Sequence, residues 1–221
     1  NGSSEELVHM INAISTNKTS FFREKAQFDL LRRTIIPELI QKKTKKRDRK
    51  IRIWSAGCST GEEPYSLAII LCDVIKDIDA WDVKILATDI STKALDIARA
   101  GVYKKKDIEG IPPLMFNACF QLGVGEKKGL FRVKRHLMDM VVVRRLNLML
   151  SKYPFRGLFD LISCRNVMIY FNKATQQEII TKFFRYLQPG GYLFLGHAES
   201  LTGVRNRFVY IQPSVYQKVK I

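Results

Sequence analysis

Short apolar runs alternate with stretches of helical periodicity between residues 51 and 195, and this alternation constrains the fold more than any other feature. The apolar runs predict strands at 51–55, 83–88, 141–146, 159–163 and 192–195. Helices are predicted between them at 62–75, at 92–100 with Ser91 as a possible cap, and at 172–187. Strands that alternate with helices form β-α-β units, which indicates an α/β fold with a mainly parallel sheet and helices on both faces. Apolar residues at 208–210 and 215–219 predict an antiparallel C-terminal hairpin.

Two regions depart from this pattern. Residues 5–14 and the stretch around Phe28 to Leu39 have apolar residues at helical spacing, and Pro37 is expected to kink or end the second helix. Between about 112 and 140, strand-like pieces flank a glycine-rich turn, which predicts a small antiparallel β insertion. We therefore expect an N-terminal helical segment and linker at 1–45, followed by a sheet domain at 46–221.

Composition narrows the function classes. The chain has 37 Lys and Arg against 21 Asp and Glu, a net charge of +16, which favours an anionic partner: nucleic acid, acidic protein or an acidic membrane surface. The basic run at 42–50 has two interpretations, a docking surface or simply a solvated face, and the second is the more common. We expect 41–52 to be an exposed connector into the first strand.

The cysteines and the absence of targeting patterns indicate the compartment. Four scattered cysteines form no C-x-x-C pair, and no His, Cys and Asp cluster has ligand spacing, so we expect neither a disulfide framework nor a metal site. No apolar run of about 18 residues and no signal-peptide pattern is visible. These observations favour a cytoplasmic protein that does not insert into a membrane.

A glycine loop follows the first predicted strand. Gly57 and Gly61 bracket it, but their spacing is neither that of the dinucleotide-binding motif nor that of a phosphate loop. Glu62 and Glu63 at the next helix start would repel a pyrophosphate and suit a ligand with a cationic part, such as an α-amino group or a sulfonium. The alternative is an ordinary strand-to-helix turn whose exposed acidic first turn is favoured by the helix dipole.

Polar residues end two further strands. Asp89, at the end of the second strand, could accept both hydroxyls of a ribose, or it could cap the helix that follows. Asn166 offers an amide after the fourth strand, and Tyr170 offers a ring or hydroxyl. Because carboxyl ends of parallel strands share one edge of a sheet, these side chains and the glycine loop are expected at the same edge.

Four motifs occur in the order typical of one family. They are Thr-Asn-Lys-Thr-Ser-Phe-Phe-Arg-Glu at 16–24, Ser-Thr-Gly-Glu-Glu-Pro-Tyr-Ser at 59–66, Cys-Arg-Asn-Val-Met-Ile-Tyr-Phe at 164–171, and Gly-His-Ala-Glu-Ser at 196–200. The order of helix, Pro-Gly-Gly turn, strand and hairpin near the C-terminus is also common in S-adenosylmethionine-dependent methyltransferases. Over nearly its whole length the chain resembles the chemotaxis receptor methyltransferases, the CheR family.

The resemblance implies a class I methyltransferase fold and a protein-glutamate O-methyltransferase. Its reaction would transfer methyl from S-adenosylmethionine (SAM) to glutamates on acidic cytoplasmic helices of chemoreceptors, giving methyl esters and S-adenosylhomocysteine, in chemotaxis adaptation. By the family pattern, the cofactor-binding residues would be Asn17, Thr19, Arg23, Gly57, Glu63, Asp89, Asn147, Leu148, Asn166 and Val167. Arg23 and Tyr170 are the expected catalytic residues, and His197 and Glu199 are expected to brace the site loop.

The resemblance also implies partners. The insertion at 112–140 resembles the family's β-subdomain, which in some members grips a receptor tail. Residues 1–45 resemble a remnant of the family's fuller helical N-terminal domain, and a monomer is expected.

Two other functions compete with this hypothesis. A nucleic-acid methyltransferase would suit the charge but needs a base pocket with an Asn-Pro-Pro-Tyr-type motif, which the chain lacks. A non-catalytic SAM-binding adaptor would carry the same motifs, so only turnover separates it from the enzyme.

Overall fold

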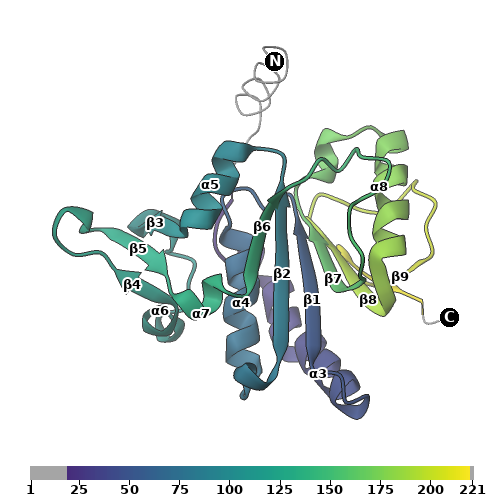
Figure 1. The fold of residues 1–221 in the computed structure, drawn as a ribbon. Helices are drawn as coiled ribbons and strands as arrows, with labels where there is room; N and C mark the ends of the chain where they lie inside the picture. Colours follow the sequence, from purple (N-terminus) through teal and green to yellow (C-terminus); the bar gives the residue numbers. More distant parts are fainter. Residues whose placement is uncertain (1–18, 220–221) are drawn as a thin grey trace.

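A mainly parallel sheet forms the centre of the computed structural model, which describes residues 19–219. Seven of the described strands lie in the order β6-β2-β1-β7-β8-β10-β9 (Figure 1). Their bounds are β1 (Lys50–Ala56), β2 (Asp82–Asp89), β6 (Val141–Arg145), β7 (Phe159–Cys164), β8 (Leu187–Leu195), β9 (Phe208–Gln212) and β10 (Val215–Lys218). Neighbouring strands from β6 to β8 pair in parallel, whereas β10 is antiparallel to both β8 and β9. The predicted α/β fold class and its antiparallel hairpin are therefore confirmed.

Helices cover both faces of this sheet. On one face lie α2 (Lys25–Leu30), a π-helical turn (Leu31–Ile35), α3 (Ile36–Lys45), α4 (Glu62–Val74), α5 (Thr92–Ala100) and α7 (Arg135–Met138), and on the other lies α8 (Lys173–Tyr186). Side chains alternate along β1, so Ile53 joins the core on the α4 side and Trp54 the core on the α8 side. Short 3₁₀ turns occur at 78–80, 105–107, 125–127 and 168–170. Among residues 19–219, no helix has both the length and the apolar character that a membrane span requires.

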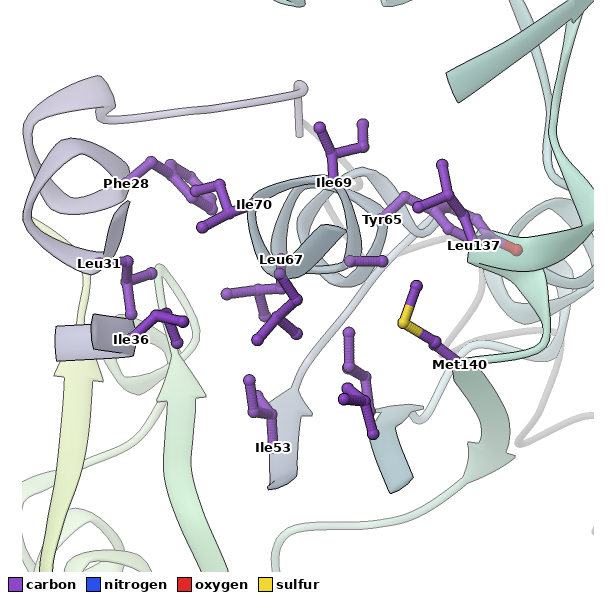
Figure 2. Close-up of a cluster of buried hydrophobic side chains, with 14 of the residues drawn as sticks. Phe28, Leu31, Ile36, Ile53, Tyr65, Leu67, Ile69, Ile70, Leu137 and Met140 are labelled. Atoms are coloured by element: carbon purple, nitrogen blue, oxygen red, sulfur yellow. The ribbon is translucent and has the colours of Figure 1, made fainter. Parts of the chain in front are cut away.

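The larger core is centred on α4. Figure 2 shows α4 between two groups of side chains, those of the N-terminal helical region and those of α7 and the residues after it. The buried members labelled there are Phe28, Leu31, Ile36, Ile53, Tyr65, Leu67, Ile69, Ile70, Leu137 and Met140. Since α4 is buried on all sides along most of its length, its apolar sequence follows from its position rather than from one amphipathic face.

The N-terminal helical region differs from the sequence-based prediction in two ways. The chain neither ends nor breaks its helix at Pro37, because a π-helical turn precedes it and the amide of Ile36 already donates to the carbonyl of Leu31. The helix also continues to Lys45, so the prediction of an exposed connector from residue 41 is wrong. Lys43 explains the extension, because its ammonium lies 3.1 Å from Asp48 and 3.0 Å from Asp160, which ties the helix end to the sheet.

A second, smaller sheet stands beside the main one. It consists of β3 (Val102–Lys104), β5 (Leu130–Val133) and β4 (Phe120–Leu122), all antiparallel, with α6 (Pro113–Cys119) next to β4 (Figure 1). The antiparallel pairing predicted between 112 and 140 is confirmed. Its third strand, β3, lies before that stretch and was not predicted, since only three residues form it and two of them precede a run of lysines.

Most predicted strand and helix bounds lie within two residues of the observed ones, with one clear exception. β8 begins at Leu187, not Tyr192, so the predicted Pro-Gly-Gly turn is part of the strand. The pairing register with β7 shifts between Phe159 and Leu161, and Gly190 has a φ of +73°, which accommodates the irregular start. The helix predicted at 5–14 lies outside the described residues.

Candidate functional site

The strand order reverses direction between β1 and β7, which is where open α/β sheets bind ligands. From β1 the chain moves outward through β2 to β6 and then returns to β7 on the other side of β1. The predicted site residues follow the carboxyl ends of these strands: the glycine loop after β1, Asp89 at the end of β2, Asn147 after β6 and Asn166 after β7. The topology therefore brings four separate sequence stretches to one edge of the sheet.

The glycine loop contacts the turn after β7. The amides of Gly57 and Cys58 both donate to the Thr88 carbonyl, at 2.7 and 2.9 Å, which fixes the loop to β2. Gly57 has a φ of +83°, and a Cβ at that position would lie 2.4 Å from Cγ2 of Val167. A glycine is thus required both by the backbone conformation and by the close approach of Val167.

Asp89 joins the glycine loop to the start of α5. One carboxylate oxygen accepts from the amide of Ser59 at 2.8 Å, and the other accepts from the amide of Ser91 at 2.9 Å. The N-cap of α5 is Ser91 itself, whose hydroxyl accepts from the Ala94 amide at 3.2 Å, as the sequence predicted. Each oxygen of Asp89 still has a lone pair that can accept from a ligand hydroxyl.

Glu63 lies in the first turn of α4 with both oxygens engaged. Oε1 accepts from the Ser55 hydroxyl at 2.7 Å, and Oε2 accepts from Nη1 of Arg165 at 3.2 Å. Its neighbour Glu62 is buried, so the expectation of an exposed acidic first turn is wrong for that residue. Burial raises the pKa of Glu62, although the Thr60 hydroxyl donates to its carboxylate at 2.7 Å.

Arg165 connects three parts of the chain, and the sequence-based analysis missed it. Its side chain is only 5% exposed, and its Nη2 donates to the Glu24 carboxylate at 3.0 Å and to the Arg23 carbonyl. The guanidinium also lies over the Phe28 ring, 5.1 Å from the centroid. The signal was present in the sequence, since a charged residue directly follows the six buried residues of β7.

The charges of this cluster do not balance. Glu24 and Glu63 carry two negative charges against the single positive charge of Arg165, which leaves the three groups at −1. Burial opposes ionisation of Glu24, but the His197 amide and the Arg165 guanidinium outweigh it and hold the pKa of Glu24 below its usual value. A net negative charge in a mostly buried cluster favours a ligand with a cationic group.

Glu199 braces the turn after β7, as predicted. Its carboxylate accepts from three backbone amides, those of Asn166 at 2.8 Å, Gly196 at 2.6 Å and Ile169 at 3.2 Å. Asn166 has a φ of +59°, a conformation that asparagine tolerates better than most residues. The neighbouring His197 contributes through its backbone, whose amide donates to Glu24 at 3.2 Å.

The N-terminal segment crosses the same edge of the sheet. The amide of Phe22 donates to the Ser66 hydroxyl at 3.0 Å, and the side chain of Gln27 donates to the Leu195 carbonyl at 2.8 Å. Arg23 lies between these anchors and is half-buried, as is Thr19. The segment thus brings the backbone of Arg23 to the Arg165 cluster, where its carbonyl accepts a hydrogen bond from the Arg165 guanidinium. Asn17 lies outside the described residues.

The remaining predicted residues lie around this centre. Asn147 and Leu148 follow β6, next to the end of β2, where the amide of Leu146 donates to the Asp89 carbonyl at 3.0 Å. Tyr170, on a 3₁₀ turn after β7, is 61% exposed, so its hydroxyl is open to a large substrate. Burial raises the pKa of both nearby thiols, Cys58 and Cys164, well above the usual range, which keeps them protonated and unreactive.

Comparison with known proteins shows the family to which the chain belongs. The model of the CheR methyltransferase SAM-binding domain matches residues 17–216. The chain belongs to this CheR family. The match begins at Asn17 and covers the described site residues, so the family's domain includes the N-terminal segment as well as the sheet.

Curated relatives of the CheR chain are similar over almost its full length. The chemotaxis protein methyltransferase of Borreliella burgdorferi is 44% identical over 214 residues, which cover 96% of this chain and 74% of that protein. The chemotaxis protein methyltransferase of Escherichia coli is 40% identical over 217 residues, or 98% of this chain and 72% of that protein. Among solved structures, a SAM-dependent methyltransferase from Methanosarcina mazei matches with a TM-score of 0.39 and 19% identity, covering 67% of this chain and 52% of that one.

Proposed function

We propose that this CheR protein transfers methyl from SAM to glutamate side chains on the acidic cytoplasmic helices of chemoreceptors. The products are glutamate methyl esters and S-adenosylhomocysteine, and the reaction serves chemotaxis adaptation in the cytoplasm. The observation that carries the proposal is the Glu24–Arg165–Glu63 cluster at the strand-order reversal, with its net charge of −1. SAM has a cationic sulfonium and an α-ammonium group, which such a cluster attracts.

The residues present fit SAM. Glu63 would bind near the methionine ammonium group, and Asp89 has the acceptor capacity for two ribose hydroxyls. Asn147 and Leu148 would contact the adenine, while Gly57, Asn166 and Val167 would line the pocket. Asn17, Thr19 and Arg23 would contact the cofactor from the N-terminal segment. When bound, SAM supplies an electrophilic methyl group on a positively charged sulfur.

The protein needs no general base for this reaction. A glutamate side chain has a reference pKa of about 4.3, so the substrate is already an ionised nucleophile at neutral pH. The chain's task is to bind, orient and exclude water, because water stabilises the separate charges that disappear in the transition state. Arg23 can hold a carboxylate in its guanidinium fork, and the exposed Tyr170 can orient the substrate side.

The proposal also assigns surfaces to the receptor. Acidic receptor helices complement the net charge of +16, and the small β3-β5-β4 sheet would hold a receptor tail. The protein acts as a monomer in this proposal, without a metal and without nucleic acid. The charge also suits a nucleic-acid methyltransferase, and the SAM site also suits a non-catalytic adaptor, so the experiment must separate all three.

The deciding experiment measures transfer of radiolabelled methyl from SAM to a purified chemoreceptor cytoplasmic fragment. Label that mild base releases, and that disappears when the receptor's target glutamates are changed to alanine, would establish carboxyl methyl esters. Arg23→Ala is expected to lower turnover at least tenfold without unfolding the protein. Arg33→Ala, which changes an exposed arginine in the same helical region, is the matched control and should leave turnover unchanged.

Three outcomes would overturn parts of the proposal. Binding of SAM with no label on the receptor favours the adaptor. Label on added RNA or DNA favours the nucleic-acid enzyme. Normal turnover in Arg23→Ala removes Arg23 from the mechanism.

A further inference from the structure

A lysine of α8 is buried beneath the loop that follows β6. Lys182 is 7% exposed, and its ammonium donates to the carbonyls of Leu148 and Leu150, both at 2.8 Å. The same ammonium lies over the Tyr153 ring, 4.9 Å from the centroid. The Tyr153 hydroxyl also donates to the Leu148 carbonyl at 2.8 Å. One loop therefore receives three hydrogen bonds from two buried side chains.

A lysine is an unusual choice at this position. Its helical neighbours Ile179 and Phe183 are fully buried against the sheet, so an apolar residue would pack there at no electrostatic cost. Burial lowers the pKa of the Lys182 ammonium, which indicates that the charged form is penalised. The lysine supplies what an apolar residue cannot, namely hydrogen bonds to two backbone carbonyls.

These hydrogen bonds determine the path of the loop. Two carbonyls two residues apart both turn toward α8, and Met149 between them is 59% exposed. The amide of Met149 donates to the Asn147 side chain at 2.9 Å, which closes a tight turn. Without the ammonium, Leu150 would lose its donor and Leu148 would keep only the Tyr153 hydroxyl. The turn that presents Asn147 and Leu148 would then be free to rearrange.

We infer that Lys182 is a positioning residue for the adenosine end of the cofactor, acting from the far side of the loop through the carbonyls of Leu148 and Leu150. This inference rests on the proposed function, in which Asn147 and Leu148 contact the adenine. Lys182 does not touch the ligand. It fixes the backbone geometry of the residues that do.

The chain offers a matched control for this inference. Lys218 of β10 also donates to two carbonyls, those of Phe184 and Leu187, both at 2.7 Å, and lies over the Phe184 ring at 4.6 Å. Burial lowers its pKa as well, although Lys218 is only half-buried. Leu187, one of its two acceptors, is the first residue of β8, so the Lys218 ammonium lies at the opposite edge of the sheet from the site, which follows the carboxyl ends of the strands.

The test compares Lys182→Met with Lys218→Met. Both variants should lower the melting temperature, because each removes two hydrogen bonds from an ammonium to backbone carbonyls. Only Lys182→Met is expected to raise the Kd for S-adenosylhomocysteine, measured by calorimetry, by about tenfold. 5′-Methylthioadenosine lacks the amino-acid end, and its Kd should rise by the same factor. In turnover assays, Lys182→Met should raise the KM for SAM and leave kcat at saturation within about twofold.

Each outcome has one meaning. If the wild-type protein does not bind S-adenosylhomocysteine, the proposed function fails. If the wild type binds and both lysine variants bind equally well, the proposed function stands and the role of Lys182 is wrong. If Lys182→Met does not fold, Lys182→Gln replaces it, because the shorter amide keeps a polar group at this position but lacks the reach of the ammonium to both carbonyls. A Kd at least threefold above that of the wild type then supports the inference, and an unchanged Kd overturns it.

Discussion

The carboxylate of Glu24 lies 3.0 Å from Nη2 of Arg165, although 141 residues separate the two in the chain. Arg165 holds Glu63 with its other terminal nitrogen, so one guanidinium joins the N-terminal segment, the end of β7 and the start of α4. Arg23 and Glu24 are adjacent. The backbone of the proposed catalytic arginine is therefore held by the ion pair of its neighbour Glu24 and by the hydrogen bond from Arg165 to the Arg23 carbonyl.

Glu24→Gln should lower methyl transfer about tenfold while the protein stays folded. The change removes the charge that holds the segment to Arg165, and the remaining amide can accept from only one of the two donors. We expect the free energy of unfolding to fall by about 1–3 kcal/mol, the usual cost of a broken charged hydrogen bond. Asp73→Asn, which breaks the exposed Arg32–Asp73 pair at 2.6 Å, is the control and should change neither quantity much. Equal rates in the two variants would contradict the role of Glu24.

Gly57→Ala should abolish SAM binding and lower stability by about 2–4 kcal/mol, because a side chain there meets both an unfavourable φ and the Val167 methyl group. Gly125→Ala separates the two causes. Gly125 has a φ of +60° with no atom within 4 Å of the added Cβ, so it reports the backbone cost alone, about 1 kcal/mol. Urea unfolding measures the loss of stability in both glycine variants. The double variant Gly57→Ala with Val167→Ala should recover part of the loss, and no recovery would mean that the contact with Val167 is unimportant.

Glu199→Gln should destabilise the turn after β7. An amide has one acceptor oxygen where the carboxylate has two, so at least one of the three backbone amides would lose its partner. We expect a loss of about 1–3 kcal/mol in urea unfolding and a weaker affinity for S-adenosylhomocysteine. Glu126→Gln, on the exposed 3₁₀ turn between β4 and β5, should leave both values unchanged. Faster hydrogen exchange at Asn166 and Ile169 in Glu199→Gln would locate the effect.

Glu62→Gln should stabilise the protein at neutral pH. Burial raises the folded-state pKa of Glu62 above the ordinary value of 4.5, so the ionised form costs stability at pH 7, and glutamine removes that cost. The gain should be present above the raised pKa and should disappear as the pH falls toward 4.5, where the wild-type carboxyl is protonated. Melting temperatures of the wild type and of Glu62→Gln, measured between pH 4 and 8, test this expected pH dependence. A constant difference across that range would show that ionisation is not the cause.

Local patterns predicted most of the fold correctly. The alternation of strands and helices, the Ser91 cap and the C-terminal hairpin depend on residues close in sequence, which is why they could be read from it. β3 and the early start of β8 were missed because pairing with distant strands creates them: β3 pairs with β5, and β8 pairs with β7 despite Pro189 and two glycines.

The site was predicted less completely, for the same reason. Motifs singled out the glycine loop and Asp89 as candidates, which the topology brings to one edge of the sheet, and Glu199 braces the turn after β7 as expected. They did not identify Arg165 or Lys182, because the hydrogen-bond partners of both side chains lie more than thirty positions away in the sequence. A buried charge becomes interpretable only when the groups that compensate it are known. The spacing of residues in the sequence does not reveal the Glu24–Arg165 pair, whose members lie 141 positions apart.

Phe21 links the N-terminal segment to the small sheet. It is 2% exposed, and its ring lies against Tyr103 of the small sheet at 5.0 Å and against Phe120 at 5.6 Å. Its carbonyl is so close to Gly110 that a Cβ there would lie 2.5 Å away. The small sheet and the segment that carries Arg23 are thus packed directly against each other. Local opening of that sheet would release Phe21 and, two residues along, the backbone of Arg23.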